Sequence, residues 1–269
     1  MKHRRNYRCA LITGASSGLG EELAIQLAHR TAHLVLVARR ESLLQDLAER
    51  LRAAYPETAV SVFAMDLTRP EERKRLVEML AADGLSPDLL VNNAGMGDYG
   101  EFASAEWTKL EATLRINIEA LTHLTHLLVP GMIRGGGGAV MNISSLASIL
   151  PIPDFAVYAA TKAYVTSFSE ALRIELRDHG IRVLAVCPGP VHTEFGNVAR
   201  RGDSGPGMPA REFFYEPKET VVYDAIDALD RDRARVYPGL KIALAACVIS
   251  ALPLVLLRAA LSNRPRRNG

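Results

Sequence analysis

"TGASSGLG", residues 13–20, is the stretch that decides the fold. It follows a short apolar run and leads into a segment with leucines at helical spacing. Gly14, Gly18 and Gly20 permit a tight turn and let the backbone approach a pyrophosphate, which would meet the N–H groups at the start of the helix. This strand–turn–helix context near the start of the chain predicts nucleotide binding.

Apolar runs and helical patterns alternate along the rest of the chain. Strands are predicted at residues 7–14, 32–39, 59–67, 87–95, 135–145, 181–189 and 233–239. Helices are predicted at residues 18–30, 40–55, 70–84, 104–133, 153–180 and 218–230, with a bend near Pro130. Such alternation indicates right-handed βαβ units and a parallel sheet covered on both faces. We therefore predict an α/β fold, a Rossmann-like doubly wound parallel sheet of about seven strands, in a single domain over residues 1–239.

Two segments break this pattern. Residues 194–218 are rich in glycine, proline and aromatic residues, which is typical of a functional lid or of disorder. Residues 240–269 form an apolar tail, with 16 uncharged residues between Lys241 and Arg258. Three interpretations stay open: the tail packs on the body or on another subunit, it lies on a membrane surface with its basic end on anionic lipid, or it spans a bilayer.

Composition and charge exclude several classes of function. The net charge of +2 is too small to indicate nucleic-acid binding. The three widely spaced cysteines indicate neither a disulfide framework nor a metal site, and His123 and His126 lack a carboxylate or cysteine at metal spacing. The apolar run near the start is too short for a secretory signal. We expect a cytoplasmic protein without a metal, which could contact a membrane peripherally through residues 241–261.

Five motifs follow the glycine turn in order. They are "NNAG" (92–95), Asn117 in "LRINIEA", "NISS" (142–145), "YAATK" (158–162) and "PGPVHT" (188–193). Tyr158 and Lys162 are one helical turn apart and share a face, and Tyr158 follows Ser145 by 13 residues. With the glycine turn, this set resembles the short-chain dehydrogenase/reductase family over about residues 7–193.

The resemblance implies catalytic roles for Asn117, Ser145, Tyr158 and Lys162. Ser145 would hydrogen-bond a carbonyl oxygen while NADPH delivers hydride to the carbon, and Tyr158 would donate the proton. A free phenol titrates at about pH 10, so Lys162 and the oxidised nicotinamide are expected to lower the pKa of Tyr158. Lys162 would also hold the nicotinamide ribose, and Asn117 would hold a water for proton relay.

The resemblance also implies how the cofactor is held. Arg39 ends the second strand and Arg40 follows it, where an NAD-preferring site would carry an acidic side chain. Cations there suit the 2′-phosphate of NADP, so NADP(H) is expected and NAD is the alternative. The expected cofactor contacts are Gly14, Ser16, Ser17, Gly18, Leu19, Gly20, Arg39, Arg40, Asp66, Leu67, Asn93, Ala94, Gly95, Tyr158, Lys162, Pro188, Gly189, Val191 and Thr193.

The 194–218 lid is expected to close the substrate pocket. Its aromatic residues and Met208 suggest an apolar carbonyl or alcohol, such as a lipid, steroid-like or aromatic compound. The expected substrate-binding residues are Ser145, Tyr158, Phe195, Phe213 and Phe214.

Two other functions remain as alternatives. A non-catalytic NADP-binding regulator of the same fold would be expected to have lost part of the Asn/Ser/Tyr/Lys set, which is complete here. A nucleotide-sugar epimerase or dehydratase usually has a larger C-terminal substrate domain. The resemblance also implies a homodimer or homotetramer, formed through the long helices at about 104–128 and 154–179.

Overall fold

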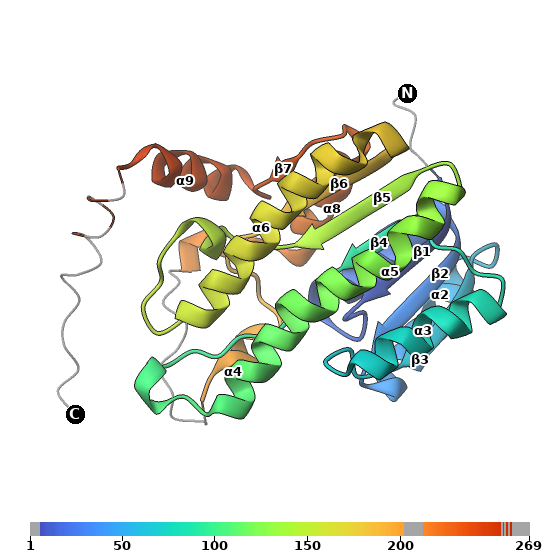
Figure 1. Ribbon diagram of the computed structural model, residues 1–269, viewed down its shortest axis with the longest axis horizontal. Helices are drawn as coiled ribbons and strands as arrows, with labels where there is room; N and C mark the ends of the chain where they lie inside the picture. Colours follow the sequence, from blue (N-terminus) through green and yellow to red (C-terminus); the bar gives the residue numbers. More distant parts are fainter. Residues whose placement is uncertain (1–5, 202–211, 254, 256, 258, 260–269) are drawn as a thin grey trace.

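The computed structural model describes residues 6–201, 212–253, 255, 257 and 259 (Figure 1). Its strands are β1 (Tyr7–Thr13), β2 (Thr31–Ala38), β3 (Ala59–Ala64), β4 (Leu89–Asn92), β5 (Gly138–Ile143), β6 (Ile181–Val186) and β7 (Arg235–Val236). They form one parallel sheet in the order β3-β2-β1-β4-β5-β6-β7, which confirms the predicted doubly wound fold. The strand order reverses between β1 and β4, and a ligand crevice is expected at the carboxyl ends of these two strands.

Helices cover both faces of the sheet (Figure 1). They are α1 (Gly18–Ala28), α2 (Glu41–Ala54), α3 (Pro70–Ala82), α4 (Trp107–Leu114), α5 (Leu121–Arg134), α6 (Ala156–Leu176), α7 (Phe195–Ala199), α8 (Lys218–Asp230) and α9 (Leu240–Ala251). Successive side chains of β1 point to opposite faces: Ile12 packs with α1, α2 and α8, whereas Leu11 packs with α3, α5 and α6. These two apolar clusters fix the sheet between its helix layers.

The helix predicted over 104–133 departs from regular α-helix at a position that the sequence pattern did not indicate. It runs as α4, a π-helical segment (Arg115–Ala120) and α5, and Pro130 lies inside α5. The widened turn contains Asn117, whose side chain bonds the backbone of Met96. The departure from regular helix therefore occurs where a buried side chain is tied to the loop after β4, as is common for π turns at functional sites.

Both segments that broke the sequence pattern contain helix. The predicted lid begins with α7 and resumes at a short 3-10 turn (Glu212–Phe214), while residues 202–211, with Met208, lie outside the described residues. The tail begins with α9, which lies at the opposite end of the molecule from α2 and α3 (Figure 1). Among the described residues, none of the helices is long and apolar enough to cross a bilayer.

Candidate active site

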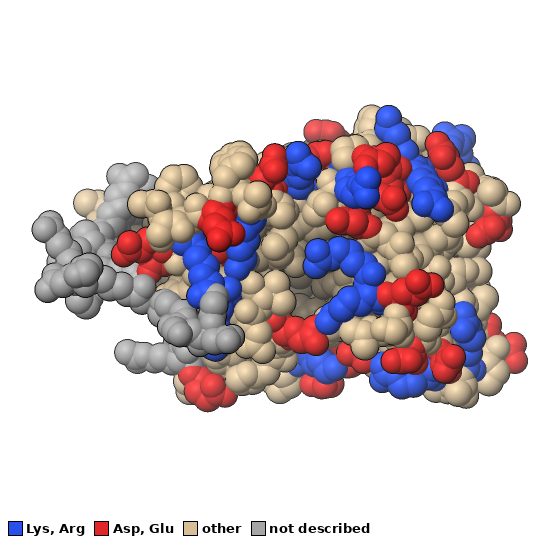
Figure 2. Space-filling view, turned by 90° about the horizontal axis from the view of Figure 1, so that it is seen from below, with Lys and Arg blue, Asp and Glu red and all other residues tan. Residues whose placement is uncertain are grey.

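A cavity of about 830 Å³ lies at the carboxyl ends of the central strands. Figure 2 shows this hollow in the surface, with basic side chains at its rim. All the predicted cofactor residues except Gly20 line it, and so do Ser145, Phe195 and Phe214. Asn117, Gly20 and Phe213 do not line the cavity.

The glycine turn forms one end of the cavity. Gly14 and Gly18 have φ values of +66° and +60°, which favour glycine over any other residue. Gly20 lies so close to the Gly14 carbonyl that a Cβ on Gly20 would overlap it, so only glycine fits at this position. Thr13 Oγ1 accepts the backbone N–H groups of Asn93 and Ala94, both at 3.0 Å. The turn is thereby locked to the end of β4.

A dinucleotide fits this cradle by its shape and its donors. The turn exposes backbone beside the start of α1, where N–H groups favour a phosphate, and it leaves no room for side chains at Gly14 or Gly20. Asp66 lines the neighbouring wall, and its Oδ1 accepts the backbone N–H of Thr68 at 3.0 Å and the hydroxyl at 2.8 Å. The residues present therefore fit a nucleotide cofactor across the β1–β4 crevice.

The two arginines after β2 line the cavity beside the glycine turn. Arg39 is exposed and makes no hydrogen bond or ion pair with a described residue. Arg40 donates to Ser17 Oγ at 2.7 Å and to Ser16 Oγ at 3.2 Å, and it pairs with Glu194 Oε2 at 2.8 Å. The Arg40 hydrogen bond lowers the pKa of Glu194. Glu194, which the sequence pattern did not indicate, links the glycine turn to the start of α7.

Ser145, Tyr158 and Lys162 converge on the middle of the cavity. α6 carries Tyr158 and Lys162 on one face, and Ser145 lies just beyond β5. The Lys162 ammonium lies 5.6 Å from the centre of the Tyr158 ring and donates to Ile143 O at 2.8 Å. Ser145 Oγ accepts the backbone N–H of Ala147 at 3.1 Å, which orients its hydroxyl toward the cavity wall that Tyr158 shares.

Burial dominates the ionisation of the two α6 residues. It raises the pKa of Tyr158 to about 12, against the lowering effect of a hydrogen bond with Ser145. It lowers the pKa of Lys162 to about 8. Burial outweighs the Ser145 hydrogen bond, and the expected lowering of the Tyr158 pKa by Lys162 and the oxidised nicotinamide stays a prediction. Both groups are biased toward their uncharged forms.

Asn117 is fully buried behind the cavity wall. Its Oδ1 accepts the Met96 N–H at 3.0 Å, and its Nδ2 donates to Met96 O and to Thr161 Oγ1, both at 2.9 Å. Both amide hydrogens of Asn117 already have acceptors. A water held by Asn117 would therefore have to donate its hydrogen bond to an oxygen atom of that residue. The structure shows Asn117 as a link between the loop after β4 and α6, close behind Lys162.

Apolar side chains form the other end of the cavity. Phe155 stacks on Tyr158 with ring centroids 4.2 Å apart, and Phe195 lies 5.3 Å from the same ring. Further apolar lining comes from residues that include Leu150, Ile152, Val198, Phe214, Tyr215, Ala245 and Ile249. Phe155 was missed, although its position three residues before Tyr158 on a predicted helix placed it next to that ring.

Phe213 was predicted to bind substrate, and the structure places it outside the cavity. Its side chain is 65% exposed, and the Lys241 ammonium lies 4.9 Å from the ring centre. Phe214 packs edge-on against it, with ring centroids 5.3 Å apart, and faces inward. Neighbouring residues of this short turn point in different directions, so only one of the two rings reaches the pocket.

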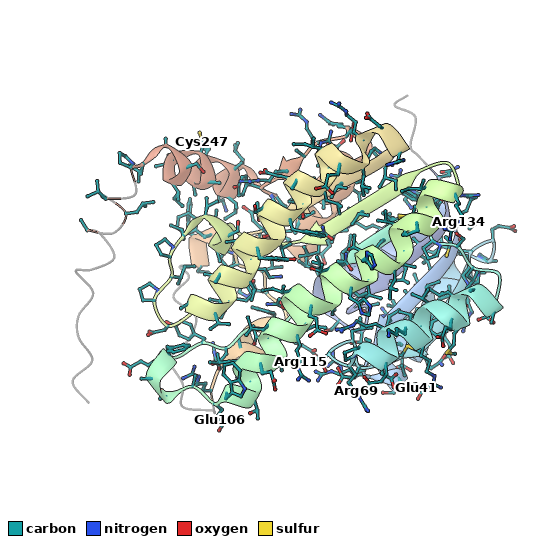
Figure 3. All side chains as sticks on the ribbon, viewed as in Figure 1. Glu41, Arg69, Glu106, Arg115, Arg134 and Cys247 are labelled. Atoms are coloured by element: carbon teal, nitrogen blue, oxygen red, sulfur yellow. The ribbon has the colours of Figure 1, made fainter. Side chains whose placement is uncertain are left out.

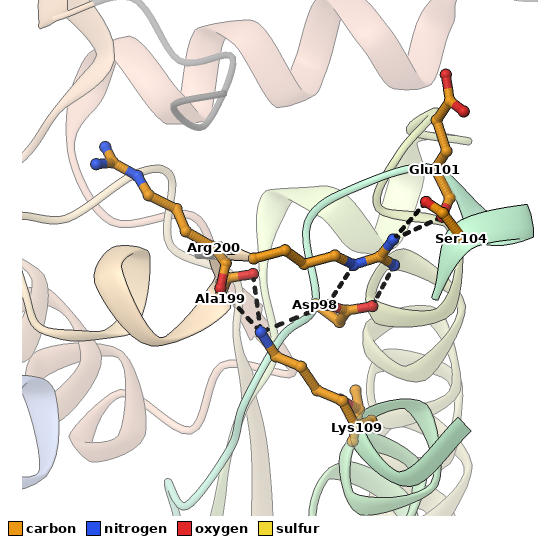
Figure 4. A network of polar contacts seen from close by, with 8 residues as sticks. Asp98, Glu101, Ser104, Lys109, Ala199 and Arg200 are labelled. Carbon is orange, nitrogen blue, oxygen red and sulfur yellow. Dashed lines mark hydrogen bonds and ion pairs between the residues drawn. The ribbon is translucent and has the colours of Figure 1, made fainter. Parts of the chain in front are cut away.

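A buried carboxylate anchors the end of α7 (Figure 4). The Asp98 side chain is 1% exposed and accepts Arg201 Nε at 2.8 Å, with Lys109 Nζ at 3.4 Å. Lys109 also donates to Arg200 O at 2.9 Å. Although burial raises the pKa of Asp98, Arg201 and Lys109 bring it below the usual value. This network joins α4 to α7, which lines the apolar end of the cavity.

Within the described part of the chain, no group of three or more His, Cys, Asp or Glu side chains could hold a metal ion. Cys247 is a free, exposed cysteine on α9, and its side chain points away from the body (Figure 3).

Comparisons with known proteins agree with this geometry. The family model described as "short chain dehydrogenase" matches residues 8–203. A short-chain dehydrogenase from Sphingobium yanoikuyae, solved in complex with NADPH, is 32% identical, with a TM-score of 0.80 over 97% of this chain and 98% of that chain. The bulky-bulky ketone specific alcohol dehydrogenase from Comamonas testosteroni is 30% identical, with a TM-score of 0.76 over 98% and 97% of the two chains.

A curated relative is longer than this chain. The very-long-chain 3-oxoacyl-CoA reductase of Phaeosphaeria nodorum is 36% identical over 194 residues, which are 71% of this chain. The chain spans 57% of the length of that relative.

Proposed function

Because the chain belongs to the short-chain dehydrogenase family, we propose that it is an oxidoreductase that interconverts a carbonyl and an alcohol on an apolar substrate with NADP(H). One observation carries the proposal. The Ser145 hydroxyl, the Tyr158 phenol and the Lys162 ammonium line the same cavity as the glycine turn on one side and an apolar pocket on the other. A reacting carbon held there would lie between cofactor and proton donor.

NADPH, when bound, supplies the hydride. Ser145 would donate a hydrogen bond to the carbonyl oxygen, and Tyr158 would transfer its proton to that oxygen. A phenol is protonated at neutral pH, and burial raises the pKa of Tyr158 further, which suits a proton donor in the direction of reduction. The tyrosinate that remains is disfavoured by the same burial, so a charged Lys162 is needed to stabilise it.

Preference for NADPH over NADH is proposed for Arg39 and Arg40. Two guanidinium groups at the end of β2 suit the 2′-phosphate, and the two positions directly after β2 carry these basic side chains instead of an acidic one that would bind ribose hydroxyls. Glu194 competes for Arg40 in this structure. Arg39 is free of described partners and is the better placed of the two to meet a phosphate directly.

The apolar pocket supports a bulky substrate. Aromatic rings surround Tyr158, and the wall beyond them is aliphatic. The similar Comamonas enzyme acts on bulky-bulky ketones, and the Phaeosphaeria relative on very-long-chain 3-oxoacyl-CoA, which fits a hydrophobic carbonyl substrate here.

The proposed setting is a cytoplasmic homodimer or homotetramer with a peripheral membrane contact over residues 241–261. Exposed apolar residues on α4 and α6, Trp107 at 64% and Ile174 at 71%, support pairing through these helices. Light scattering after size-exclusion chromatography measures the assembly, and a monomer at micromolar concentration would exclude it.

The test of function is NADPH oxidation with a panel of bulky ketones. Tyr158→Phe should lower kcat by about 10²- to 10⁴-fold with NADPH affinity retained. Tyr164→Phe is the matched control on the same helix, because its hydroxyl bonds Thr122 at 3.0 Å and does not line the cavity. Retained turnover in Tyr158→Phe removes the proton-donor assignment. Tight NADPH binding without turnover on any ketone or alcohol would point instead to a non-catalytic regulator.

A further inference from the structure

α9 is apolar on all sides but packs on the body through one side only. Ile242 and Ala246 are buried, whereas Leu240, Leu244 and Val248 are 77%, 59% and 60% exposed. Leu252 and Val255 extend the exposed set, and Cys247 also points outward (Figure 3). A helix that is hydrophobic all round is normally buried in protein or in lipid. Among the described residues, the outer face of α9 therefore has no partner of the kind that its composition calls for.

The inner face of the same helix belongs to the active-site cavity. Ala245 and Ile249 line the substrate end, and Ile242 packs so closely on Gly189 that a Cβ there would overlap it. Only the thickness of one helix separates the outer apolar face from the pocket. Whatever covers α9 is thus adjacent to the route by which an apolar molecule reaches Tyr158.

The positive charge of the C-terminal segment indicates which kind of partner covers α9. Residues 240–269 contain five Lys and Arg residues and no Asp or Glu. Lys241, at the start of α9, places its ammonium over the ring of the exposed Phe213 and donates to Phe213 O at 3.4 Å. Apolar side chains flanked by cations suit an anionic lipid surface. Two copies of this chain paired through α9 would bring like charges together.

We propose that α9 and Phe213 form a docking surface for an anionic lipid bilayer, and that docking opens the substrate end of the cavity to molecules dissolved in that bilayer. α9 would lie in the interface plane, with Leu244 and Val248 among the acyl chains and Lys241 at the headgroups. The substrate class would then be a membrane-partitioned ketone or alcohol. This second part rests on the proposed oxidoreductase function, and the docking itself does not.

Vesicle flotation of the full chain tests the docking. Wild type should float with phosphatidylcholine vesicles containing 30 mol% phosphatidylglycerol, and at least tenfold less with pure phosphatidylcholine or in high salt. Leu244→Glu/Val248→Glu should lower flotation at least tenfold, with unchanged NADPH affinity. Met79→Glu on α3, an exposed apolar residue at the other end of the molecule, is the control and should float like wild type.

Kinetics test the substrate route separately. The double variant should keep kcat/KM for a short water-soluble ketone and lose at least tenfold for a long-chain ketone carried in the anionic vesicles. Wild type that stays unbound at every composition overturns the docking. A dimer in sedimentation velocity that the double variant dissociates assigns the face to a second copy, and also overturns it. Flotation without turnover of any ketone would refute the proposed function and leave the docking standing.

Discussion

Replacement of Lys162 by methionine is expected to stabilise the cofactor-free protein at pH 7 while abolishing turnover. The residue is 5% exposed, and burial lowers its pKa from 10.5 to about 8. That decrease corresponds to a cost of about 3 kcal/mol for holding the charge inside the protein. Methionine keeps the aliphatic stem packed, and loss of the hydrogen bond to Ile143 O removes about 1 kcal/mol. The expected net gain in the free energy of unfolding is about 2 kcal/mol.

The pKa of Lys162 also fixes the sign of the pH dependence. Below about pH 8 the ammonium is charged in the folded and the unfolded chain, so the cost of burial is present in full. Between about pH 8 and 10.5 the unfolded chain holds a proton that the folded chain has released, and wild-type stability rises with pH. The variant lacks this rise. The difference in the free energy of unfolding that favours the variant should therefore shrink as pH rises. Near the upper end of this pH range, the variant should be less stable than wild type by about 1 kcal/mol.

Urea unfolding followed by circular dichroism at pH 7, 8, 9 and 10 measures the difference between wild type and variant. Lys74→Met on α3 is the control, because its ammonium is exposed and its replacement should change neither stability nor pH dependence. If Lys162→Met is less stable than wild type at pH 7, by an amount that does not change with pH, then burial of the Lys162 charge does not lower the free energy of unfolding of the wild type.

Three further outcomes are expected. Arg39→Ala/Arg40→Ala should weaken NADPH binding at least tenfold and leave NADH binding within about threefold, measured by fluorescence titration; equal losses for both would exclude a 2′-phosphate site. Asp98→Asn should lower the free energy of unfolding by about 2–3 kcal/mol at pH 7, and by less on acidification, because the wild-type carboxylate loses its contribution as pH falls through its lowered pKa. For wild type, kcat/KM for ketone reduction should fall above about pH 8 as Lys162 loses its charge; a flat profile from pH 6 to 10 contradicts its role.

Local patterns were sufficient to predict the sheet and the cofactor turn. Alternating strands and helices leave few topologies, and the glycines of the turn are dictated by backbone geometry that only glycine satisfies. The position of Tyr158 and Lys162 on one face follows from helical spacing alone. These features depend on residues close in sequence, or on a chain order that the βαβ rule fixes.

Features that depend on contacts between distant segments could not be predicted in the same way. Phe213 and Phe214 are chemically alike, and only the packing of the turn against α9 decides which ring faces the cavity. In the sequence, Glu194 looks like an ordinary surface acid. Its partner Arg40 lies 154 positions earlier in the chain, and only the fold brings the two side chains together. The tail left three interpretations open because its sequence does not show that Ile249 lines the cavity.

The opposite pKa shifts of Tyr158 and Lys162 have one cause, and it joins substrate binding to proton transfer. The apolar walls that suit a hydrophobic ketone also exclude water from both groups, which favours the neutral phenol and the neutral amine. A neutral phenol is ready to donate, but the tyrosinate left behind gains little from solvent. The Lys162 charge, one helical turn away, then becomes the main nearby compensation. In the proposed mechanism, Tyr158 and Lys162 would therefore act as a unit, because burial removes both groups from water.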